Sequence, residues 1–318
     1  MQNTDCSCFC EYGGRTKVIS ILGKPVTVKS YICSPDGIHY QNKPEQIKLQ
    51  LSVCPTTFCP GKCPFCMLTD TAENRRLDPE KFASVMRRLK EEDRIRGVKI
   101  TGGEPFTDVG LLNEVICILY EIFGYTLELS VSTNGIGLNR MHEIGDLVHL
   151  ETIHISRHHY DDAVNKSLFG GANVPSGGQL KEIISSVTYR DLFVLNCLLL
   201  KDAVNSPEEA HRFLDFAMEI GAPKVGFMTC SPVNAYAERQ RIPYESVIRD
   251  DDPTLLFTRG FYDYEFCHCS DGVYASDRGG IIEFYGRSTK FARYAYSRGL
   301  VYGADNHLRD GFGGEIIV

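Results

Sequence analysis

The 318-residue chain lacks a run of about 18 consecutive apolar residues, so we expect no membrane-spanning helix. The opening residues, MQNTDCSCFCEYGG, lack a basic segment followed by an apolar one. We therefore expect no secretory signal and a cytoplasmic protein with reduced thiols. Basic residues are outnumbered, 34 to 41, and the formal net charge of −7 disfavours bulk binding of nucleic acid.

The composition also excludes a disulfide-stapled scaffold. Thirteen cysteines in 318 residues are too few for a small disulfide-rich protein, and an odd number cannot all pair within one chain. In a reducing compartment, such a surplus of cysteine indicates metal binding or catalysis. The hydrophobic content of 43% is that of an ordinary globular protein with a full core.

Residues 46–230 have an alternating rhythm of strands and helices. Strands are predicted at residues 47–53, 98–101, 126–133, 152–156, 192–200 and 224–228, and helices at 78–92, 111–123, 178–189 and 207–220. Parallel strands need crossover connections, which helices provide. We therefore predict an α/β fold, a partial (βα)6 barrel with parallel strands, with a flat doubly wound sheet as the alternative. In both folds, ligands bind at the carboxyl ends of the strands.

Two flanking regions break this rhythm. Residues 1–45 are predicted to form a small N-terminal β-rich accessory segment with a β-hairpin, because two β-rich stretches flank a turn at residues 23–25. Residues 231–318 are predicted to form a C-terminal extension. It would carry a β-hairpin of residues 261–267 and 280–285 and cover the mouth of the barrel.

The strongest motif is CPTTFCPGKCPFC, residues 54–66, which contains the spacing Cys59-x3-Cys63-x2-Cys66. Three thiolates in eight residues, with proline and glycine between them, form a tight loop suited to a soft metal centre. Such a loop indicates an iron–sulfur cluster. Zinc with Cys54 as a fourth ligand, or plain buried cysteines, are the alternatives, because structural zinc takes four ligands.

This motif, with the aromatic Phe65 before its last cysteine, resembles the radical S-adenosylmethionine superfamily. The resemblance implies that the three cysteines hold a 4Fe–4S cluster and that S-adenosylmethionine chelates the fourth iron. One electron then cleaves the sulfonium, and a 5′-deoxyadenosyl radical abstracts hydrogen from a small-molecule or peptide substrate. An electron donor such as flavodoxin or ferredoxin is an implied partner.

Further residues at strand ends extend the resemblance. Gly102-Gly103-Glu104-Pro105 matches the family's GGEP motif, which binds the methionine moiety, and Ser132-Thr133-Asn134-Gly135 resembles its STNG-type motif. Ser156 ends the fourth strand, where the family often places a ligand-contacting serine. Asn196 lies within the fifth strand and is either a cofactor contact or a core amide with satisfied hydrogen bonds.

Candidate catalytic residues follow the fourth and sixth strands. His158, His159 and Tyr160 would face the substrate if they point into the barrel mouth, and the alternative is a capped helix start. Cys230 ends the sixth strand and could be a hydrogen-atom donor, a cluster ligand or packing.

The subgroup with the molybdenum-cofactor precursor synthase and peptide maturases is the most similar one. Its auxiliary cluster would need a second cysteine set, for which Cys230, Cys267 and Cys269 are the candidates. A peptide cross-linking maturase, a methyl or aminocarboxypropyl transferase, and a non-enzymatic zinc or cluster module remain the alternative functions. Cys6, Cys8 and Cys10 fit either a free tail or a metal site shared with Cys33.

Overall fold

The computed structural model describes the parts of the chain that carry the predicted barrel and most of its flanks. The described residues are 16–29, 31–33, 39–41, 47–68, 73–249, 251–260, 272–277, 281–285 and 299–318.

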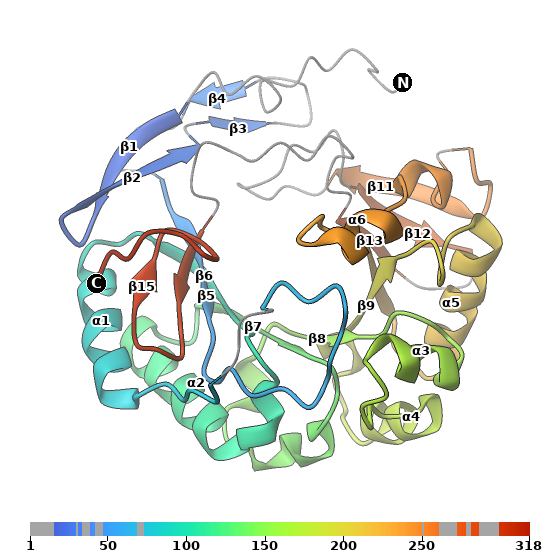
Figure 1. Ribbon diagram of the computed structural model, residues 1–318, viewed down its shortest axis with the longest axis horizontal. Helices are drawn as coiled ribbons and strands as arrows, with labels where there is room; N and C mark the ends of the chain where they lie inside the picture. Colours follow the sequence, from blue (N-terminus) through green and yellow to red (C-terminus); the bar gives the residue numbers. More distant parts are fainter. Residues whose placement is uncertain are drawn as a thin grey trace.

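An eleven-stranded sheet forms the centre of the molecule, in the order β11-β12-β13-β10-β9-β8-β7-β6-β5-β14-β15 (Figure 1). The run from β13 to β14 is parallel throughout. Its bounds are β5 Leu49–Val53, β6 Ile95–Ile100, β7 Glu128–Thr133, β8 Thr152–Ser156, β9 Phe193–Leu199, β10 Lys224–Thr229, β13 Ile281–Tyr285 and β14 Leu300–Tyr302. The six strands predicted within 46–230 are adjacent, and they confirm the partial barrel.

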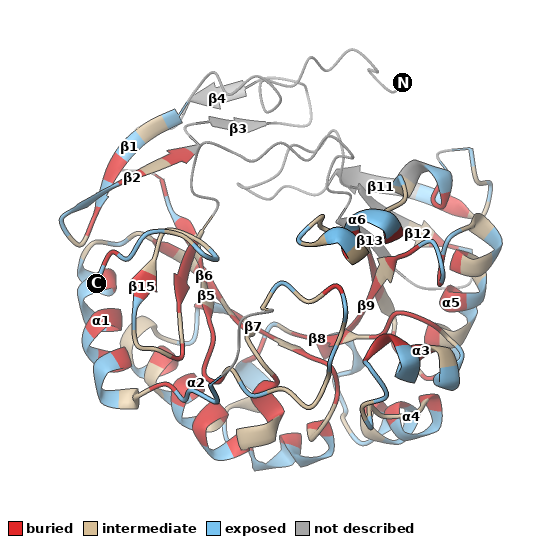
Figure 2. Cartoon of the chain, in the orientation of Figure 1, coloured by how far each residue is buried: buried red, intermediate tan, exposed pale blue. Residues whose placement is uncertain are grey.

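Most of the described helices lie along the outside of the curved sheet, whereas the last of them lies toward its open side near β13 (Figure 1). They are α1 Pro79–Glu91, α2 Val109–Phe123, α3 Asp162–Leu168, α4 Gly177–Ser185, α5 Pro207–Glu219 and α6 Ala235–Gln240, with short 3-10 turns η2 Pro105–Asp108, η3 Leu138–Glu143, η4 Leu147–His149, η5 Arg190–Leu192 and η6 Tyr244–Ser246. Their sheet-facing sides are buried and their outer sides exposed (Figure 2). The hydrophobic core therefore lies between the sheet and its helices.

Helix α1 forms where its capping residues predict it. The Asp78 side chain accepts hydrogen bonds from the backbone N–H groups of Glu80 and Lys81, and Pro79 occupies the first turn. Its apolar face is buried through Phe82, Val85, Met86 and Leu89. Capping and periodicity were therefore sufficient to predict this element.

The two faces of the parallel sheet differ in chemistry. Ser132 pairs with His154, and Ser156 pairs with Asn196, so these four side chains share one face. The alternate residues, such as Ile155 and Leu195, belong to the hydrophobic core beneath the helices. The concave side of the sheet, which we call the lumen, is therefore polar.

Antiparallel pieces complete the described fold. Strands β1 Thr16–Ile21 and β2 Lys24–Lys29 form the predicted N-terminal hairpin, and β3 Tyr31–Cys33 pairs with β4 His39–Gln41. Strand β12 Gly272–Ser276 pairs with β13 and with β11 Leu255–Gly260, while β15 Leu308–Arg309 pairs with β14. The predicted strand at 261–267 lies outside the described residues. The chain's last segment adds β14 to the edge of β5, so it extends the sheet itself.

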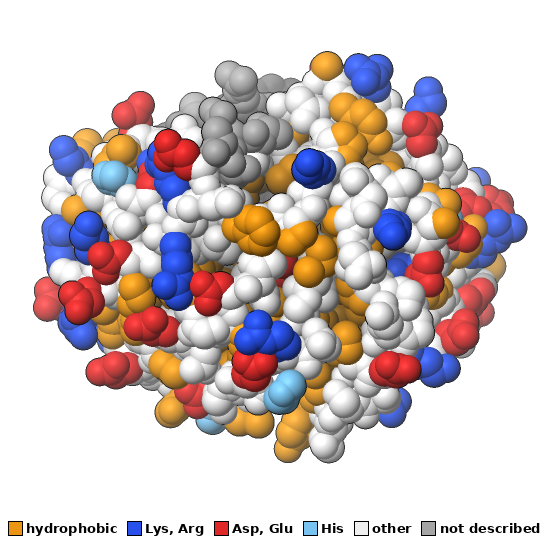
Figure 3. All heavy atoms as spheres, turned by 60° about the horizontal axis from the view of Figure 1, so that its bottom comes forward, with side chains coloured by type: hydrophobic (Ala, Val, Ile, Leu, Met, Phe, Trp, Pro, Cys, Tyr) orange, Lys and Arg blue, Asp and Glu red, His pale blue; other side chains and the backbone are white. Residues whose placement is uncertain are grey.

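Charges of both signs alternate over the face drawn in Figure 3, where lysine and arginine side chains lie among aspartates and glutamates. Within the described ranges, no helix is both long enough and apolar enough to cross a bilayer.

Candidate functional site

The cysteine loop, residues 54–68, begins directly after β5 at the carboxyl edge of the sheet. Cys59, Cys63 and Cys66 are reduced and partly buried. Burial, followed by the neighbouring thiols of Cys66 and Cys59, raises the pKa of the Cys63 thiol to about 12. The three sulfurs therefore lie close enough to affect one another electrostatically, and a thiolate here needs a positive partner such as a metal.

The three thiols can be compared with the ligand sets of two kinds of metal centre. Among the described residues, no three His, Cys, Asp or Glu side chains converge as a single metal ion requires. A 4Fe–4S cluster requires a different arrangement of ligands. Each cysteine binds a different iron, so the sulfurs surround the cluster and do not converge on one ion. Three neighbouring thiols on one loop are therefore the ligand set that such a cluster uses.

Three separate elements hold the cysteine loop. Asn134, after β7, donates from Nδ2 to the sulfur of Cys59 at 3.5 Å. Phe169, after α3, accepts a hydrogen bond from the backbone N–H of Lys62 at 3.0 Å. Asn234, the N-cap of α6, donates from Nδ2 to the carbonyl of Pro64 at 2.9 Å. The loop is thus tied to the strand ends on both sides of the barrel.

The GGEP segment packs directly on the cysteine loop. The N–H groups of Gly103 and Glu104 donate to the carbonyls of Thr56 and Phe58, at 2.9 and 2.8 Å. A Cβ on Gly103 would stand 2.1 Å from the Phe58 carbonyl oxygen, so no other residue fits this approach. Close backbone contact with the loop explains the glycine here.

Glu104 is fully buried, and its carboxylate has three protein donors. It accepts hydrogen bonds from the Phe106 N–H at 3.0 Å, the Thr133 hydroxyl at 2.7 Å and the Asn134 N–H at 2.6 Å. Burial raises the pKa of this carboxyl to about 7, against the lowering effect of the three donors. The carboxylate thus orders the ends of β6 and β7, a role that the sequence did not indicate.

The lumen holds a hydrogen-bonded row below the mouth. The ring of His154 lies 3.0 Å from the Thr152 hydroxyl and, through Nδ1, 3.2 Å from the Asn196 amide nitrogen. Burial, followed by the charge of Lys99, lowers the pKa of His154 to about 3, so the ring is neutral. The other end of the amide, Asn196 Oδ1, is buried without a hydrogen-bond partner. An orphaned polar atom facing a polar lumen suits contact with a bound ligand.

The two histidines after β8 point to different parts of the molecule. His158 is buried against the cysteine loop, with its ring edge-to-face to Phe65 at 5.2 Å and stacked on Phe169 at 5.1 Å. Its Nδ1 accepts from the Leu198 N–H at 3.2 Å, and burial lowers the pKa of His158 to about 3. Among the sequence-predicted candidates, His158 and Phe65 are therefore brought together beside Cys66.

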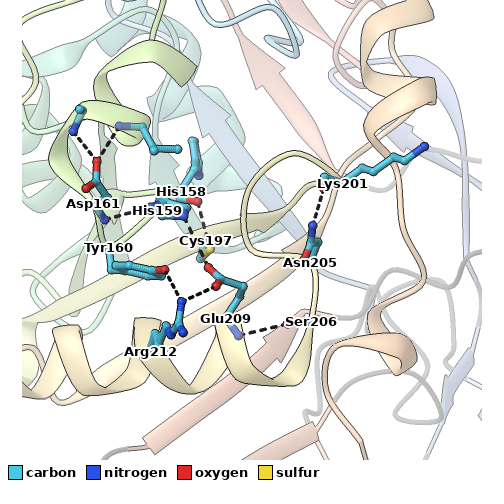
Figure 4. A network of polar contacts seen from close by, with 12 residues as sticks. His158, His159, Tyr160, Asp161, Cys197, Lys201, Asn205, Ser206, Glu209 and Arg212 are labelled. Atoms are coloured by element: carbon cyan, nitrogen blue, oxygen red, sulfur yellow. Dashed lines mark hydrogen bonds and ion pairs between the residues drawn. The ribbon is translucent and has the colours of Figure 1, made fainter.

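His159 and Tyr160 turn the other way, toward α5 (Figure 4). His159 Nε2 lies 3.6 Å from the Glu209 carboxylate, and Arg212 donates to the Tyr160 hydroxyl at 3.2 Å. Asp161 caps α3 by accepting from two backbone N–H groups, as the capped-helix alternative predicts. The structure thus places these two side chains in a network with an outer helix, apart from the cysteine loop.

Arg157 was missed by the sequence reasoning. It is 1% exposed and donates to the carbonyls of His159, Tyr160 and Pro175 and to the Asp162 carboxylate. Its guanidinium also lies over the Phe216 ring, 4.8 Å from the centroid. Arginine at the end of an apolar strand was the available signal, because a buried guanidinium must be paired.

Cys230 lies in a small buried apolar cluster with Phe65, Leu168 and Leu200, against which Cys63 also packs. Burial raises the pKa of its thiol to about 11. The structure therefore places Cys230 in packing behind the cysteine loop. Its proposed partners Cys267 and Cys269, and the N-terminal Cys6, Cys8 and Cys10, lie outside the described residues.

Comparison with known proteins agrees with this geometry. Residues 53–175 match the family model described as the radical SAM superfamily. A curated protein of Sulfurisphaera tokodaii, named probable GTP 3′,8-cyclase, is 26% identical over 190 residues, which cover 58% of this chain and 56% of that protein. The range matched by the family model, residues 53–175, contains the cysteine loop, the GGEP turn and Ser132-Thr133-Asn134-Gly135.

A solved structure shares the fold. Streptococcus suis SuiB bound to S-adenosylmethionine superposes with a TM-score of 0.53 and 14% identity, covering 83% of this chain and 60% of that chain. SuiB bound to its precursor peptide SuiA superposes with a TM-score of 0.47 and 19% identity, covering 62% and 42%. The chain spans less than two thirds of the length of each of these relatives. The family-model match itself assigns residues 53–175 to the radical S-adenosylmethionine superfamily.

Proposed function

We propose that this chain is a radical S-adenosylmethionine enzyme whose 4Fe–4S cluster is held by Cys59, Cys63 and Cys66. The observation that carries the proposal is the contact between the cysteine loop and the GGEP turn, through the N–H groups of Gly103 and Glu104. This contact joins the cluster ligands to the turn that the family uses for the methionine moiety. Both stand at the carboxyl edge of parallel strands, where α/β folds bind ligands.

Cys59, Cys63 and Cys66 would hold the cluster, which would supply the one electron needed to split S-adenosylmethionine into methionine and an adenosyl group that takes a hydrogen atom from the substrate to become 5′-deoxyadenosine. The chain's own residues bind and orient. The Asn134 amide hydrogen-bonds the Cys59 sulfur, and the Glu104 carboxylate holds the strand ends that carry Asn134 and the GGEP turn. Ser132, Ser156 and Asn196 present polar groups to the lumen, and we assign them to cofactor or substrate contact.

The proposed substrate is a small molecule or a peptide, and the proposed reductant is a small electron-transfer protein such as flavodoxin or ferredoxin. An external reductant is required because each turnover consumes one electron. We assign no auxiliary cluster to the described residues, because Cys230 lies in an apolar cluster.

The test is anaerobic reconstitution with iron and sulfide, followed by reduction with dithionite in the presence of S-adenosylmethionine. We expect a brown protein with about four irons per chain and production of 5′-deoxyadenosine. The triple variant C59A/C63A/C66A should lose both the colour and the product. The exposed Cys117 provides the matched control, so C117A should keep both.

Two results would overturn the proposal. One is a colourless zinc-containing wild type that forms no 5′-deoxyadenosine. The other is cleavage that persists in the triple variant, which would assign the cluster to other residues.

A further inference from the structure

The end of α3 closes against the cysteine loop. The carbonyl of Phe169 accepts the Lys62 N–H at 3.0 Å, and Gly170 follows with a φ of +66°. A Cβ built on Gly170 would lie 2.8 Å from both the Cβ and the carbonyl oxygen of Lys62. Lys62 immediately precedes Cys63, so the approach of backbone to backbone is made next to a cluster ligand.

An aromatic stack reinforces this contact. The Phe169 ring is 2% exposed and lies parallel to the His158 ring, with an interplanar angle of 12°. Its Cδ1 is 3.7 Å from the position that a Cβ on Gly61 would take. On the other side, His158 meets Phe65. The stack therefore touches the loop at two points, one between Cys59 and Cys63 and one adjoining Cys66.

We propose that Phe169 and Gly170, which we call the strap, hold the cysteine loop closed around its cluster and set how fast iron is lost. Gly170 is the positioning residue, and His158 supports the strap from the strand side. This inference rests on the proposed function, because it concerns retention of the proposed cluster.

The physical argument is that iron can leave only when the loop opens. Opening near Lys62 breaks its hydrogen bond to Phe169 and separates the loop from a buried ring. Both contacts exist only in the closed loop, so losing them raises the population of the open form from which iron is released. A side chain at position 170 would force the strap and the loop apart, because the nearest atoms include backbone.

Adjacent glycines provide a matched pair of variants. Gly170 and Gly171 both have positive φ, +66° and +82°, so alanine is strained at either position. A Cβ on Gly171 meets nothing within 4 Å, whereas one on Gly170 meets Lys62. The difference between G170A and G171A therefore isolates the contact with the loop from the strain of the backbone.

The measurement is anaerobic release of iron from the reconstituted protein to a coloured chelator, with thermal unfolding followed in parallel. We expect G170A to lose iron about tenfold faster than wild type, which corresponds to about 1.4 kcal/mol. G171A should lose iron at the wild-type rate, although its own backbone strain lowers its unfolding temperature.

The two histidines give a second pair, in which H158A removes the stack on Phe169, and H159A alters the network with α5 and the turn before α3 but not the stack. Iron loss should accelerate in H158A alone. The electron paramagnetic resonance signal of the reduced cluster should change in G170A and H158A and stay unchanged in the two controls.

If G170A and H158A lost iron at the wild-type rate and had wild-type spectra, the proposed role of the strap would be wrong, and the proposed function would be unaffected. A wild type that binds no iron would instead overturn the proposed function.

Discussion

The Asn134 side chain donates a hydrogen bond to the sulfur of Cys59, while its backbone N–H donates to the Glu104 carboxylate at 2.6 Å. One residue thereby connects the first of the three proposed cluster ligands to the buried carboxylate that joins β6 to β7. The side-chain oxygen accepts from the Ile136 N–H at 2.9 Å, which fixes the direction of the amide. The donor is thus preorganised toward the sulfur.

Removing this donor should make the cluster harder to reduce. An N–H···S hydrogen bond stabilises the extra negative charge of the reduced cluster, so N134A should lower its midpoint potential. We expect the fall to be larger in N134D, because a carboxylate adds negative charge beside the sulfur. Redox titration followed by electron paramagnetic resonance measures the shift, with N139A on the exposed turn η3 as the control. An unchanged potential in both Asn134 variants would contradict this role.

Substituting the buried carboxylate should weaken the fold. In the wild type, both oxygens of Glu104 accept hydrogen bonds from N–H or hydroxyl donors. In E104Q an NH2 group replaces one of these oxygens, so at least one buried donor loses its acceptor. We expect the free energy of unfolding to fall by about 1–3 kcal/mol, as measured by urea denaturation. The exposed Glu121 on α2 is the matched control, and E121Q should differ from wild type by less than about 0.5 kcal/mol. Equal stabilities of E104Q and E121Q would rule out the bridging role.

A carboxylate in the turn between β14 and β15 should give stability that depends on pH. The hydrogen bond and charge of Arg309 hold the pKa of Asp305 at about 2, below its ordinary 3.8. Because the pKa is depressed in the folded state, the stabilisation is complete above about pH 4 and is lost as the pH falls toward 2. We expect D305N to lower the free energy of unfolding by about 1–2 kcal/mol at pH 7, allowing for a carboxylate that is one-fifth exposed.

The difference between D305N and wild type should shrink steadily between about pH 4 and pH 2, the interval between the ordinary pKa of the carboxylate and its pKa in the folded protein. Denaturant unfolding at several pH values measures it. Asp251 pairs with Arg249 on the open surface, so D251N should show little change at any pH. A difference for D305N that is independent of pH would assign the effect to packing.

Much of the barrel followed from local pattern. Asp78 and Pro79 mark the start of α1, and the nearly all-apolar stretch at 192–200 predicts the doubly covered strand β9. The additions at the two edges of the barrel were not predictable in this way. Strands β13 and β14 join β10 and β5 through pairings between residues far apart in sequence, and hydrophobic periodicity carries no information on such partners.

In the candidate site, too, some features could be predicted from local sequence and others could not. Cys59, Cys63 and Cys66 could be assigned from spacing, because ligands of one metal centre on one loop are neighbours in sequence. His158 and His159 are also neighbours, yet their side chains diverge to the cysteine loop and to α5. Nothing in the letters HH distinguishes them, because the path of the backbone after β8 is set by the buried Arg157 and its carbonyl partners.

The sequence by itself determined the chemistry: three thiolates in one loop, a glycine pair after the next strand, and a parallel α/β scaffold. Tertiary structure alone decided the roles of the supporting residues. Glu104 became a buried bridge, Asn134 a donor to sulfur and Gly170 a point of contact with the loop, because each role depends on a partner between 30 and 108 residues away. Ligands on one loop can be recognised from their spacing along the chain. The burial of a side chain, and its distance from residues at other strand ends, are determined only when the sheet forms.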